Sequence, residues 1–432
     1  MASRKKPFQA LRGMKDILAK DWVYYDWILN KAKNIFEFYS FERIETPILE
    51  KAELFTKGVG KNTDIANKEM YVLRAKENKE LLALRPEGTA SVARSYIEKG
   101  MFNLSQPVKL YYFGPFFRHE KPQAGRYRQF YQLGAEIIGE SDAAADTEII
   151  TLSKIFLENL GFSSKSISLL LNSIGCSECR PNYIKELKKY YRQYNKQICA
   201  DCRRRIKENP LRVLDCKSEK CLAIKNGAPT ALDYLCSECH NHFKALLELL
   251  DYLNIPYVLD KTLVRGFDYY TRTVFEFSFG DETKRIVLGG GGRYDKLTKI
   301  LGGIQRPAVG VAFGIERLIK EIIEKGKDLN LPKPKVFLSQ IGEAAKRQSF
   351  KLLEQFRKAN ILIGESLGKE SIRAQLKIAD KLETNYVLIL GQQEVLDGMI
   401  ILKDMSSGIQ ELIPLEKIIT EVKKRLENTK GK

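Results

Sequence analysis

The sequence predicts an α+β protein with an additional α/β domain at its C-terminal end. Residues 110–117 and 129–138 are two apolar runs on either side of a charged loop, and residues 274–279 and 285–288 repeat that arrangement. Runs of this length separated by a short loop are typical of β-hairpins. After residue 335, short apolar runs alternate with helical patterns, which indicates a compact α/β unit.

The first hairpin pattern also carries the clearest chemical signal. Its second run has a period of two, in which Phe130, Gln132, Gly134 and Glu136 alternate with Tyr131, Leu133, Ala135 and Ile137. This alternation is typical of a strand and places the polar residues on one face. The loop between the runs contains Arg118, His119, Glu120, Arg126 and Arg128. Because the planar fork of arginine matches phosphate oxygens, the hairpin suits a polyphosphate substrate; an ordinary hairpin with a basic, solvated loop is the alternative.

The other elements of the first 325 residues follow from apolar spacing. Helical spacing predicts helices over residues 17–39, 147–160 and 243–253. Short apolar runs predict strands over residues 41–49 and 166–172.

Residues 326–335 (GKDLNLPKPK) are charged and contain prolines, so we expect them to be a linker. The elements expected beyond this linker are strands at 336–339, 361–363 and 386–390, helices at 344–358 and 372–381, a segment at 399–404, and a final helix from Leu415.

Length and charge narrow the class of protein. A chain of 432 residues is long enough for two or three domains, and 44% hydrophobic residues suffice for sizeable cores. The longest apolar runs are far too short to span a membrane, and the basic N-terminus lacks the apolar stretch of a signal peptide, so we expect a cytoplasmic protein. A net charge of +18 suits a polyanionic partner. Charge alone does not distinguish RNA from DNA or from an anionic surface.

Paired cysteines are the second strong signal. All eight lie within residues 176–239, in the pairs Cys176/Cys179, Cys199/Cys202, Cys216/Cys221 and Cys236/Cys239. Thiols stay reduced in the cytoplasm, and two such pairs complete one tetrahedral zinc site, so eight ligands predict two structural zinc ions. The spacing leaves open whether the pairs combine in sequence or in a nested order. His240 and His242 are alternative ligands beside the last pair, and no thioredoxin-like context supports a redox role.

The cysteine-rich segment is also basic and rich in tyrosine, as in KELKKYYRQY (residues 185–194). Basic residues interleaved with aromatic ones suit contact with an RNA backbone and its bases. A solvated face of an amphipathic helix explains the same pattern equally well.

Several blocks together resemble one enzyme family. The hairpin YYFGPFFRHEKPQAGRYRQFYQLGAEIIG (111–139) resembles motif 2 of the class II aminoacyl-tRNA synthetases, AVGVAFGIERLI (308–319) resembles motif 3, and FERIETPILE (41–50) resembles the weaker motif 1. Within that class, LVRGFDYYTRTVFEF (263–277), GGGGRYDKL (289–297) and LRPEGTASVAR (84–94) resemble the histidyl-tRNA synthetases. The family pattern has Leu where this chain has Phe267, an apolar-for-apolar change.

The resemblance implies a fold and a division into domains. It implies an antiparallel-sheet catalytic core with helices, a zinc-binding insertion domain, and a C-terminal α/β anticodon-binding domain. Many family members lack the cysteines, so the zinc prediction depends on their spacing here. The expected domains are 1–171 (core, first part), 172–256 (cysteine-rich insertion), 257–325 (core, second part), 326–335 (linker) and 336–432 (anticodon-binding domain).

The resemblance also implies which residues bind ATP. Amino-acid activation brings a carboxylate to the α-phosphate of ATP, so catalysis depends on positioning and preorganised positive charge. Arg118 and Arg265 would hold the α-phosphate and the carboxylate, and Arg317 would clamp the γ-phosphate. Glu120 and Arg126 of the hairpin loop complete the ATP site, and Mg²⁺ would bridge the phosphates.

A histidine site is implied in the same core. Glu87 and Thr89, with Gln132, would receive the ammonium group of the substrate, and Gly88 between them is also implied in histidine binding. Glu136 could accept a hydrogen bond from one ring nitrogen, or could simply pair with a nearby arginine. The hydroxyl of Tyr270 would engage the other nitrogen, and Tyr269 and Tyr294 would form the walls. A site with such buried polar groups rejects analogues that lack the nitrogens.

The implied partners are histidine tRNA, ATP, L-histidine and a second copy of the chain, since motif 1 builds a dimer interface in the family. Gln123 and Arg128 would approach the tRNA acceptor end. The main alternative is a non-catalytic, histidine-sensing paralogue of the ATP phosphoribosyltransferase regulatory type. Such paralogues typically lack the C-terminal domain, which is expected here. A zinc-dependent RNA-binding protein on a synthetase-like scaffold is a third possibility.

Overall fold

The computed structural model describes residues 8–60, 63, 65–75, 79–122, 125–280, 285–369 and 371–430. The chain divides into two compact units, Met1–Leu329 and Asn330–Lys432. The division falls inside residues 326–335, the range expected to be the linker.

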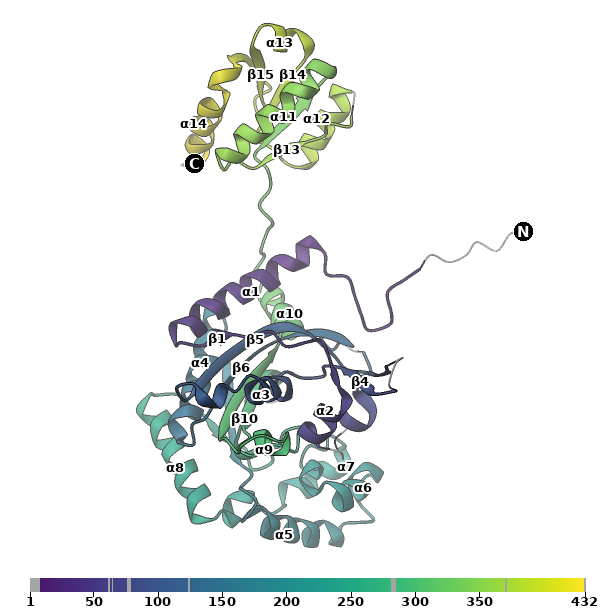
Figure 1. The fold of residues 1–432 in the computed structure, drawn as a ribbon, viewed down its shortest axis with the longest axis vertical. Coiled ribbons are helices and arrows are strands. Elements are labelled where there is room, and N and C mark those ends of the chain that lie inside the picture. Colours follow the sequence, from purple (N-terminus) through teal and green to yellow (C-terminus); the bar gives the residue numbers. More distant parts are fainter. Residues whose placement is uncertain are drawn as a thin grey trace, which may run out of the picture. The chain divides into compact units, whose positions relative to one another are not determined.

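An eight-stranded sheet forms the centre of the first unit (Figure 1). Its inner strands pair antiparallel, and the short edge strands β1 and β8 pair parallel with their neighbours. In spatial order the strands are β1 (Glu42–Arg43), β5 (Val108–Phe117), β6 (Gln129–Ile138), β11 (Ala308–Gly314), β10 (Ile286–Arg293), β9 (Thr271–Phe279), β7 (Ile167–Ser173) and β8 (Val258–Leu259).

The two faces of this sheet have different roles. One face packs against the helices α1 (Ala19–Phe38), α4 (Ala143–Asn159), α8 (Ser237–Tyr252) and α10 (Ile315–Glu324), and their apolar residues form the main core. A second, more aromatic core lies on the other face, beneath α3 (Thr89–Glu98) and α9 (Leu297–Ile300). Period-two alternation along each strand separates the two cores.

A smaller three-stranded sheet lies beside the main one in the same unit. Its order is β2 (Leu49–Lys51), β4 (Leu81–Leu84) and β3 (Val72–Arg74). The helix α2 (Ala52–Val59), the π-helical turn Ile65–Glu69 and the 3-10 turn Met101–Asn103 complete this region.

The cysteine-rich insertion leaves the sheet after β7 and has a small core of its own. Figure 1 shows its helices α5, α6 and α7 gathered together, away from α1. The elements are α5 (Arg180–Gln193), α6 (Ala200–Glu208), the 3-10 turn η3 (Pro210–Val213), α7 (Glu219–Asn226) and the 3-10 turn η4 (Ala231–Tyr234). The chain returns through α8, whose Phe243, Leu246 and Leu250 belong to the main core against the eight-stranded sheet.

The second unit is the α/β domain expected from the alternation. Its sheet has the order β13 (Ile363–Glu365), β12 (Val336–Gln340), β14 (Tyr386–Leu390), β15 (Met399–Asp404) and β16 (Gln410–Pro414). The first three strands are parallel, and β15 and β16 continue the sheet antiparallel. Its helices are α11 (Glu343–Lys358), α12 (Ile372–Lys381), α13 (Gln392–Leu396) and α14 (Ile418–Lys430), the last preceded by the 3-10 turn Leu415–Lys417.

The prediction of one strand over residues 41–49 is wrong. The chain forms β1, which pairs with β5, and then crosses to the small sheet, where β2 pairs with β4. The crossing is held by Arg85, whose Nη1 donates to the carbonyl oxygen of Thr46 at 2.6 Å. Pro47 follows directly and has no N–H to offer to a ladder.

Other differences concern element ends. The strand predicted at 285–288 continues to Arg293, because the glycine run pairs with both β9 and β11. Helix α4 begins earlier than predicted, where the side chain of Asp142 caps it by accepting from the N–H of Ala144 at 2.8 Å. The strand predicted at 361–363 is β13, displaced toward the C-terminus, and β16 and α13 were not predicted. Among the described residues, no helix is long and apolar enough to cross a membrane.

Candidate active site and metal centres

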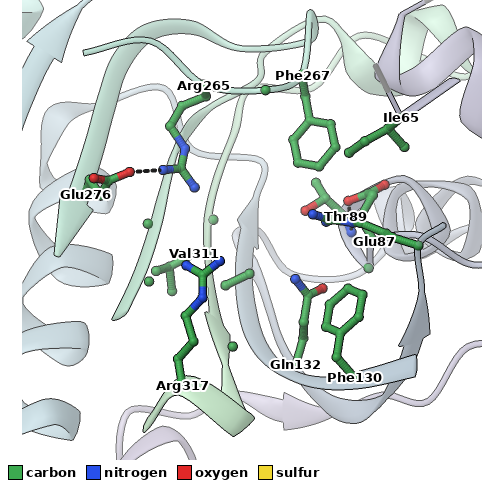
Figure 2. Close-up of a pocket in the computed structure, with 18 of the residues that line it drawn as sticks. Ile65, Glu87, Thr89, Phe130, Gln132, Arg265, Phe267, Glu276, Val311 and Arg317 are labelled. Carbon is green, nitrogen blue, oxygen red and sulfur yellow. Dashed lines mark hydrogen bonds and ion pairs between the residues drawn. The ribbon is translucent and has the colours of Figure 1, made fainter. Parts of the chain in front are cut away.

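A cavity of about 360 Å³ lies over strands β6, β9, β10 and β11, and the loop that leads into β9 closes it. It combines residues from the blocks 84–94, 111–139, 263–277, 289–297 and 308–319, whereas the segment 41–50 contributes none. In Figure 2, Arg265 and Arg317 lie on one side of the cavity and Glu87, Thr89 and Gln132 on the other. The predicted site residues that line it are Glu87, Gly88, Thr89, Arg118, Glu120, Arg126, Gln132, Arg265, Tyr269, Tyr270, Tyr294 and Arg317.

Positive charge is concentrated at one end of the cavity. Burial, and then the neighbouring charges of Arg126 and Arg118, lower the pKa of Arg317, so the three guanidinium groups are close enough to repel one another. The carboxylate of Glu120 offsets part of this charge, 3.3 Å from Nη1 of Arg126 and 3.8 Å from Nη1 of Arg118. Such a preorganised cluster attracts a polyanion.

Arg118 is held in one orientation at the end of β5. Its Nε donates to the carbonyl oxygen of Pro86 at 2.8 Å. Its guanidinium carbon lies 5.2 Å from the ring centre of Phe130 and 5.8 Å from that of Phe267. Cation–π contacts on these rings restrict the planar group before a substrate arrives.

Arg265 and Arg317 are fixed by contacts with the strands. Nη1 of Arg265 lies 2.9 Å from Oε2 of Glu276 on β9, an ion pair drawn in Figure 2. Nη1 of Arg317 donates to the carbonyl oxygen of Val287 at 3.1 Å. A Cβ atom at Gly290 would lie only 2.7 Å from Nη1 of Arg265, so this member of the glycine run provides the space for the guanidinium group.

A buried carboxylate, that of Glu136, lies behind the other end of the cavity; it is not itself a lining residue, but it contacts the lining residues Thr89 and Tyr294. The strand alternation of β6 directs Leu133, Ala135 and Ile137 into the main core and leaves Glu136 on the opposite face. Glu136 accepts hydrogen bonds from the hydroxyls of Thr89 at 2.8 Å and Tyr294 at 2.5 Å.

Glu136 has room only because Gly310 lies next to it, where a Cβ atom would overlap Oε2 of the carboxylate. Burial raises the pKa of Glu136 to about 8. Its hydrogen-bond partners within the described residues are hydroxyl groups and not an arginine.

Glu87 and Thr89 meet at the start of α3. The carboxylate of Glu87 accepts from the backbone N–H groups of Thr89 and Ala90, each at 2.7 Å, and so caps this helix with a negative charge. Burial nevertheless raises the pKa of Glu87. Gly88 lets Tyr112 approach, since a Cβ there would lie 2.2 Å from the tyrosine ring.

Aromatic rings form the wall beside these carboxylates. The ring centres of Tyr269 and Tyr270 are 4.6 Å apart, and those of Tyr269 and Tyr294 are 5.6 Å apart. Phe267 stacks on Tyr269 at 5.2 Å. This end of the cavity therefore places aromatic rings around a few oriented polar groups, as a site for a small ring-containing ligand requires.

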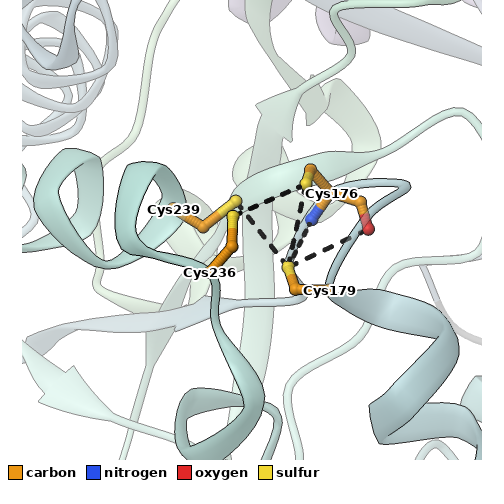
Figure 3. A group of neighbouring side chains, drawn as sticks. All are labelled: Cys176, Cys179, Cys236 and Cys239. Carbon is orange, nitrogen blue, oxygen red and sulfur yellow. Dashed lines mark hydrogen bonds between the residues drawn. The ribbon is translucent and has the colours of Figure 1, made fainter.

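The eight cysteines form two separate groups, and their order is nested. The outer pairs meet as Cys176, Cys179, Cys236 and Cys239 (Figure 3), and the inner pairs meet as Cys199, Cys202, Cys216 and Cys221. We call these the outer and the inner cluster. Within each cluster all ligand atoms lie within 4.8 Å of one another.

The sulfur spacing fits a metal ion. A tetrahedral ion with metal–sulfur bonds of about 2.3 Å holds its sulfurs about 3.8 Å apart. The Sγ atom of Cys176 lies 3.8 Å from those of Cys179 and Cys236, and Cys199 and Cys216 are separated by the same 3.8 Å. His240 is exposed and His242 lies 3.4 Å from the carboxylate of Asp146, so neither belongs to a cluster.

The outer cluster is connected to the segment 263–277, which contains Tyr270. Arg180 follows Cys179 directly, and its Nη2 donates to the carbonyl oxygen of Tyr270 at 2.7 Å and to that of Gly175 at 2.8 Å. The position of Tyr270 in the cavity therefore depends on the turn that the cluster holds.

Comparison with known proteins agrees with this geometry. Residues 13–318 match the family model described as histidyl-tRNA synthetase, and residues 335–425 match the anticodon binding domain. The chain belongs to the histidyl-tRNA synthetase family. It is 46% identical to a histidine–tRNA ligase of Dehalococcoides mccartyi, over 97% of this chain and 100% of that protein. It is 40% identical to a histidine–tRNA ligase of Desulforamulus reducens, over 96% and 98% of the two chains.

Solved structures give the same result for the fold. The apo histidyl-tRNA synthetase of S. aureus is 33% identical and has a TM-score of 0.78, with 96% of this chain and 99% of that chain covered. An ATP phosphoribosyltransferase regulatory subunit/histidyl-tRNA synthetase from Bacillus halodurans C is 23% identical, with a TM-score of 0.63 over 89% of this chain and 99% of that one, and shows the fold alone.

Arg128, one of the two residues predicted for the tRNA acceptor end, does not line the cavity. Gln123 lies outside the described residues. Arg128 donates through Nε to the carbonyl oxygen of Glu120 at 3.3 Å and through Nη1 to that of Arg12 at 3.4 Å, so it supports the hairpin loop. Its role toward tRNA in this synthetase-family chain remains a prediction.

Sequence reasoning missed several cavity residues. Tyr112 and Glu276 could have been predicted, because each lies on a strand within one of the segments that resemble the family. Glu276 is also a charged residue within an apolar run. Arg212 and Asp215 of the insertion also line the cavity. No local pattern distinguishes these two from the other charged residues of the insertion.

The buried carboxylate predicts a measurable pH dependence. Glu136 has a pKa of about 8 in the folded chain against 4.5 ordinarily, so between these values the folded state binds the extra proton and stability falls as pH rises. Glu136→Gln does not titrate. We therefore expect its melting temperature, relative to that of the unmodified chain, to rise steadily from pH 5 to pH 8. Differential scanning fluorimetry measures this, with Glu248→Gln at an exposed glutamate as control. Parallel curves for all three proteins would contradict it.

Proposed function

We propose that this chain activates L-histidine with ATP to form histidyl-adenylate and pyrophosphate, and then transfers histidine to the 3′ end of histidine tRNA. One observation carries the proposal: a single cavity joins a cluster of arginines to an end formed by Thr89 and tyrosine side chains, and the buried carboxylate of Glu136 lies directly behind this end, where it accepts from the hydroxyls of Thr89 and Tyr294. The first end suits a triphosphate and a carboxylate. The second suits a small ring with two nitrogens.

Activation forms a bond between a carboxylate oxygen of histidine and the α-phosphorus, and breaks the bond to pyrophosphate. Arg118 and Arg265 stabilise the charge that gathers between the two reacting anions, and Arg317 with Arg126 holds the γ-phosphate. Arg118, Arg265 and Arg317 are oriented by protein contacts before the substrates enter, which lowers the reorganisation needed in the transition state. Mg²⁺ accompanies ATP and neutralises part of the charge on its phosphates.

Recognition of histidine uses the buried end. Glu136 accepts a hydrogen bond from one ring nitrogen and the Tyr270 hydroxyl engages the other, while Glu87, Thr89 and Gln132 bind the ammonium group. Burial makes these groups selective, because an amino acid without the ring nitrogens leaves them unpaired. Such sites discriminate by about 10⁴- to 10⁵-fold.

In the transfer step, a hydroxyl of the terminal ribose attacks the carbonyl carbon of the adenylate and AMP leaves. Gln123 and Arg128 are proposed for the acceptor end, and residues 335–425 for the anticodon, consistent with their match to an anticodon binding domain. Because the reaction uses tRNA and ATP, and the cysteines are free thiols, we place it in the cytoplasm.

Each cysteine cluster is proposed to hold one structural Zn²⁺. The support is the donor set of four thiols and the tetrahedral sulfur spacing. All four positions of each site come from the protein, so the ions would stabilise the insertion and take no part in the reaction.

A symmetric homodimer is also proposed. The motif 1 segment leads into the small sheet, which exposes apolar side chains: Ile48, Leu49, Val72, Leu73 and Leu81. Exposed apolar groups gathered on one small sheet are typical of a surface that another chain covers. Light scattering in line with size exclusion would measure the mass, and a monomer of 49.5 kDa at micromolar concentration would contradict the proposal.

The decisive experiment is ATP–pyrophosphate exchange with each of the twenty amino acids. We expect exchange with histidine alone. Calorimetric binding of histidine without exchange would favour a histidine-sensing regulatory paralogue, and neither binding nor exchange would favour an RNA-binding scaffold. The intact RGFDYY block and the C-terminal α/β unit support the enzyme.

A further inference from the structure

The cysteine-rich insertion contributes two charged side chains to the active-site cavity. Arg212 lies in the turn η3 and Asp215 follows it, and both line the cavity together with Arg265 and Glu276. Nη2 of Arg212 is 3.1 Å from Oδ2 of Asp215. The Arg212 side chain is 14% exposed and that of Asp215 is 43% exposed, so the arginine is the more enclosed partner.

The inner cluster holds these residues in place. Val213 and Leu214 are buried in the same small core as Cys202, Cys216 and Cys221. The backbone N–H of Cys216 donates to the carbonyl oxygen of Val213 at 3.3 Å, so the turn runs directly into a ligand of the cluster.

A second set of contacts connects the turn η3 to the segment 263–277. Nδ2 of Asn209 donates to Oδ1 of Asp268 at 2.7 Å. A Cβ atom at Gly266 would lie 3.2 Å from Nη1 of Arg212, so the guanidinium group lies against the residue that follows Arg265. Burial raises the pKa of Glu276, and the carboxylate of Asp215 adds to this rise while Arg265 opposes it.

Two arginine–carboxylate pairs therefore line one cavity: Arg265 with Glu276, and Arg212 with Asp215. A phosphate can bring two oxygens to the fork of a guanidinium group. The guanidinium group then binds the phosphate more strongly than it binds a single exposed carboxylate. Asp215 is the more exposed partner and can turn to water when an anion takes its place.

We propose that Arg212 is a further substrate-binding residue, placed by the inner cluster, that binds phosphate oxygens beside Arg265. The proposal rests on the proposed function of the cavity. Two sources supply this chemistry: the phosphates of ATP during activation, and the phosphodiester backbone at the 3′ end of tRNA during transfer.

Arg212→Ala in the full-length protein tests the proposal in two assays. Loss of one charge-assisted hydrogen bond lowers kcat/KM by about 10- to 100-fold. If the phosphate is that of ATP, the fall occurs in ATP–pyrophosphate exchange without tRNA, chiefly as a higher KM for ATP. If it belongs to tRNA, exchange stays within about twofold and single-turnover transfer from preformed adenylate falls instead. Lys220→Ala, an exposed lysine between Cys216 and Cys221, loses the same charge and is the matched control.

Asp215→Asn separates binding from mere support of the turn. If Arg212 binds phosphate, removing its competing partner lowers the KM in the affected assay, opposite to Arg212→Ala, and this gain disappears in the double variant. If the pair only holds the turn, both single variants weaken activity alike, which overturns the proposal. Wild-type rates in both assays for Arg212→Ala also overturn it.

Metal content and melting temperature must match the wild type for these kinetics to be compared. If Arg212→Ala folds poorly, Arg212→Lys is used in its place. Lysine keeps the positive charge but lacks the two-pronged guanidinium group, so we expect a smaller fall in kcat/KM in the same assay. Histidine-dependent exchange by the wild type is measured alongside. The absence of exchange by the wild type would refute the proposed function itself. If the wild type catalyses exchange and Arg212→Ala is unaffected in both assays, only this inference is refuted.

Discussion

Replacing Arg265 with alanine is expected to lower kcat/KM for histidine-dependent ATP–pyrophosphate exchange by about 10³-fold. The guanidinium group of Arg265 lines the cavity, is paired at 2.9 Å with Glu276, and is given space by Gly290. It therefore offers charge to the transition state without reorganising. Steady-state exchange with saturating ATP and varied histidine measures the effect.

The control for this experiment is the partner carboxylate. Arg265→Ala leaves the partly buried carboxylate of Glu276 without its ion pair, which itself destabilises the strand. The double variant Arg265→Ala/Glu276→Gln removes that charge. If exchange recovers in the double variant, the loss came from the unpaired carboxylate of Glu276 and not from missing transition-state stabilisation. A defect that persists at an unchanged melting temperature supports the catalytic role.

Removing metal from the cysteine clusters is expected to unfold the insertion and abolish aminoacylation. Structural zinc sites contribute about 10–16 kcal/mol of folding free energy, more than the small core of the insertion can replace. The purified chain should contain two zinc ions, one for each group of four cysteines. Mass spectrometry of metal content, with limited proteolysis of the insertion before and after chelation, measures both effects.

Single substitutions separate the two clusters. Cys221→Ser should remove the ion of the inner cluster, and Cys239→Ser that of the outer cluster. Because Arg180 joins the outer cluster to the carbonyl oxygen of Tyr270, loss of that ion should also raise the KM for histidine. Ser237→Ala, between Cys236 and Cys239, is the matched control. A chain without bound metal that resists proteolysis as well as the untreated protein would contradict the structural role.

Much of the fold is encoded in short stretches of sequence. The alternation in residues 129–138 correctly predicted β6 with both of its ends, and the same alternation places Gln132 and Glu136 on the face opposite the main core. Strands and helices of the second unit were predicted for the same reason. A period of two or of 3.6 residues is a local property, and burial of one face enforces it.

The failures have a common cause. Residues 41–49 show a strand-like run, yet the chain changes sheets there because Arg85, distant in sequence, binds the carbonyl oxygen of Thr46. The strand β16 follows Asp404 through a tight turn and has weak alternation, so its pairing with β15 outweighs its local pattern. Propensity is a weak guide wherever such long-range contacts decide the conformation.

At the site, the sequence and its motifs predicted the residue types, including three arginines, the carboxylates and the four cysteine pairs. Three properties depended on packing alone. The nested order of the cysteine pairs, the high pKa of Glu136, and the entry of Arg212 into the cavity each require residues far apart in sequence to meet. Local spacing specifies which side chains share a face of one element. Only the packed elements specify which of those faces lose water and which distant charges they then meet.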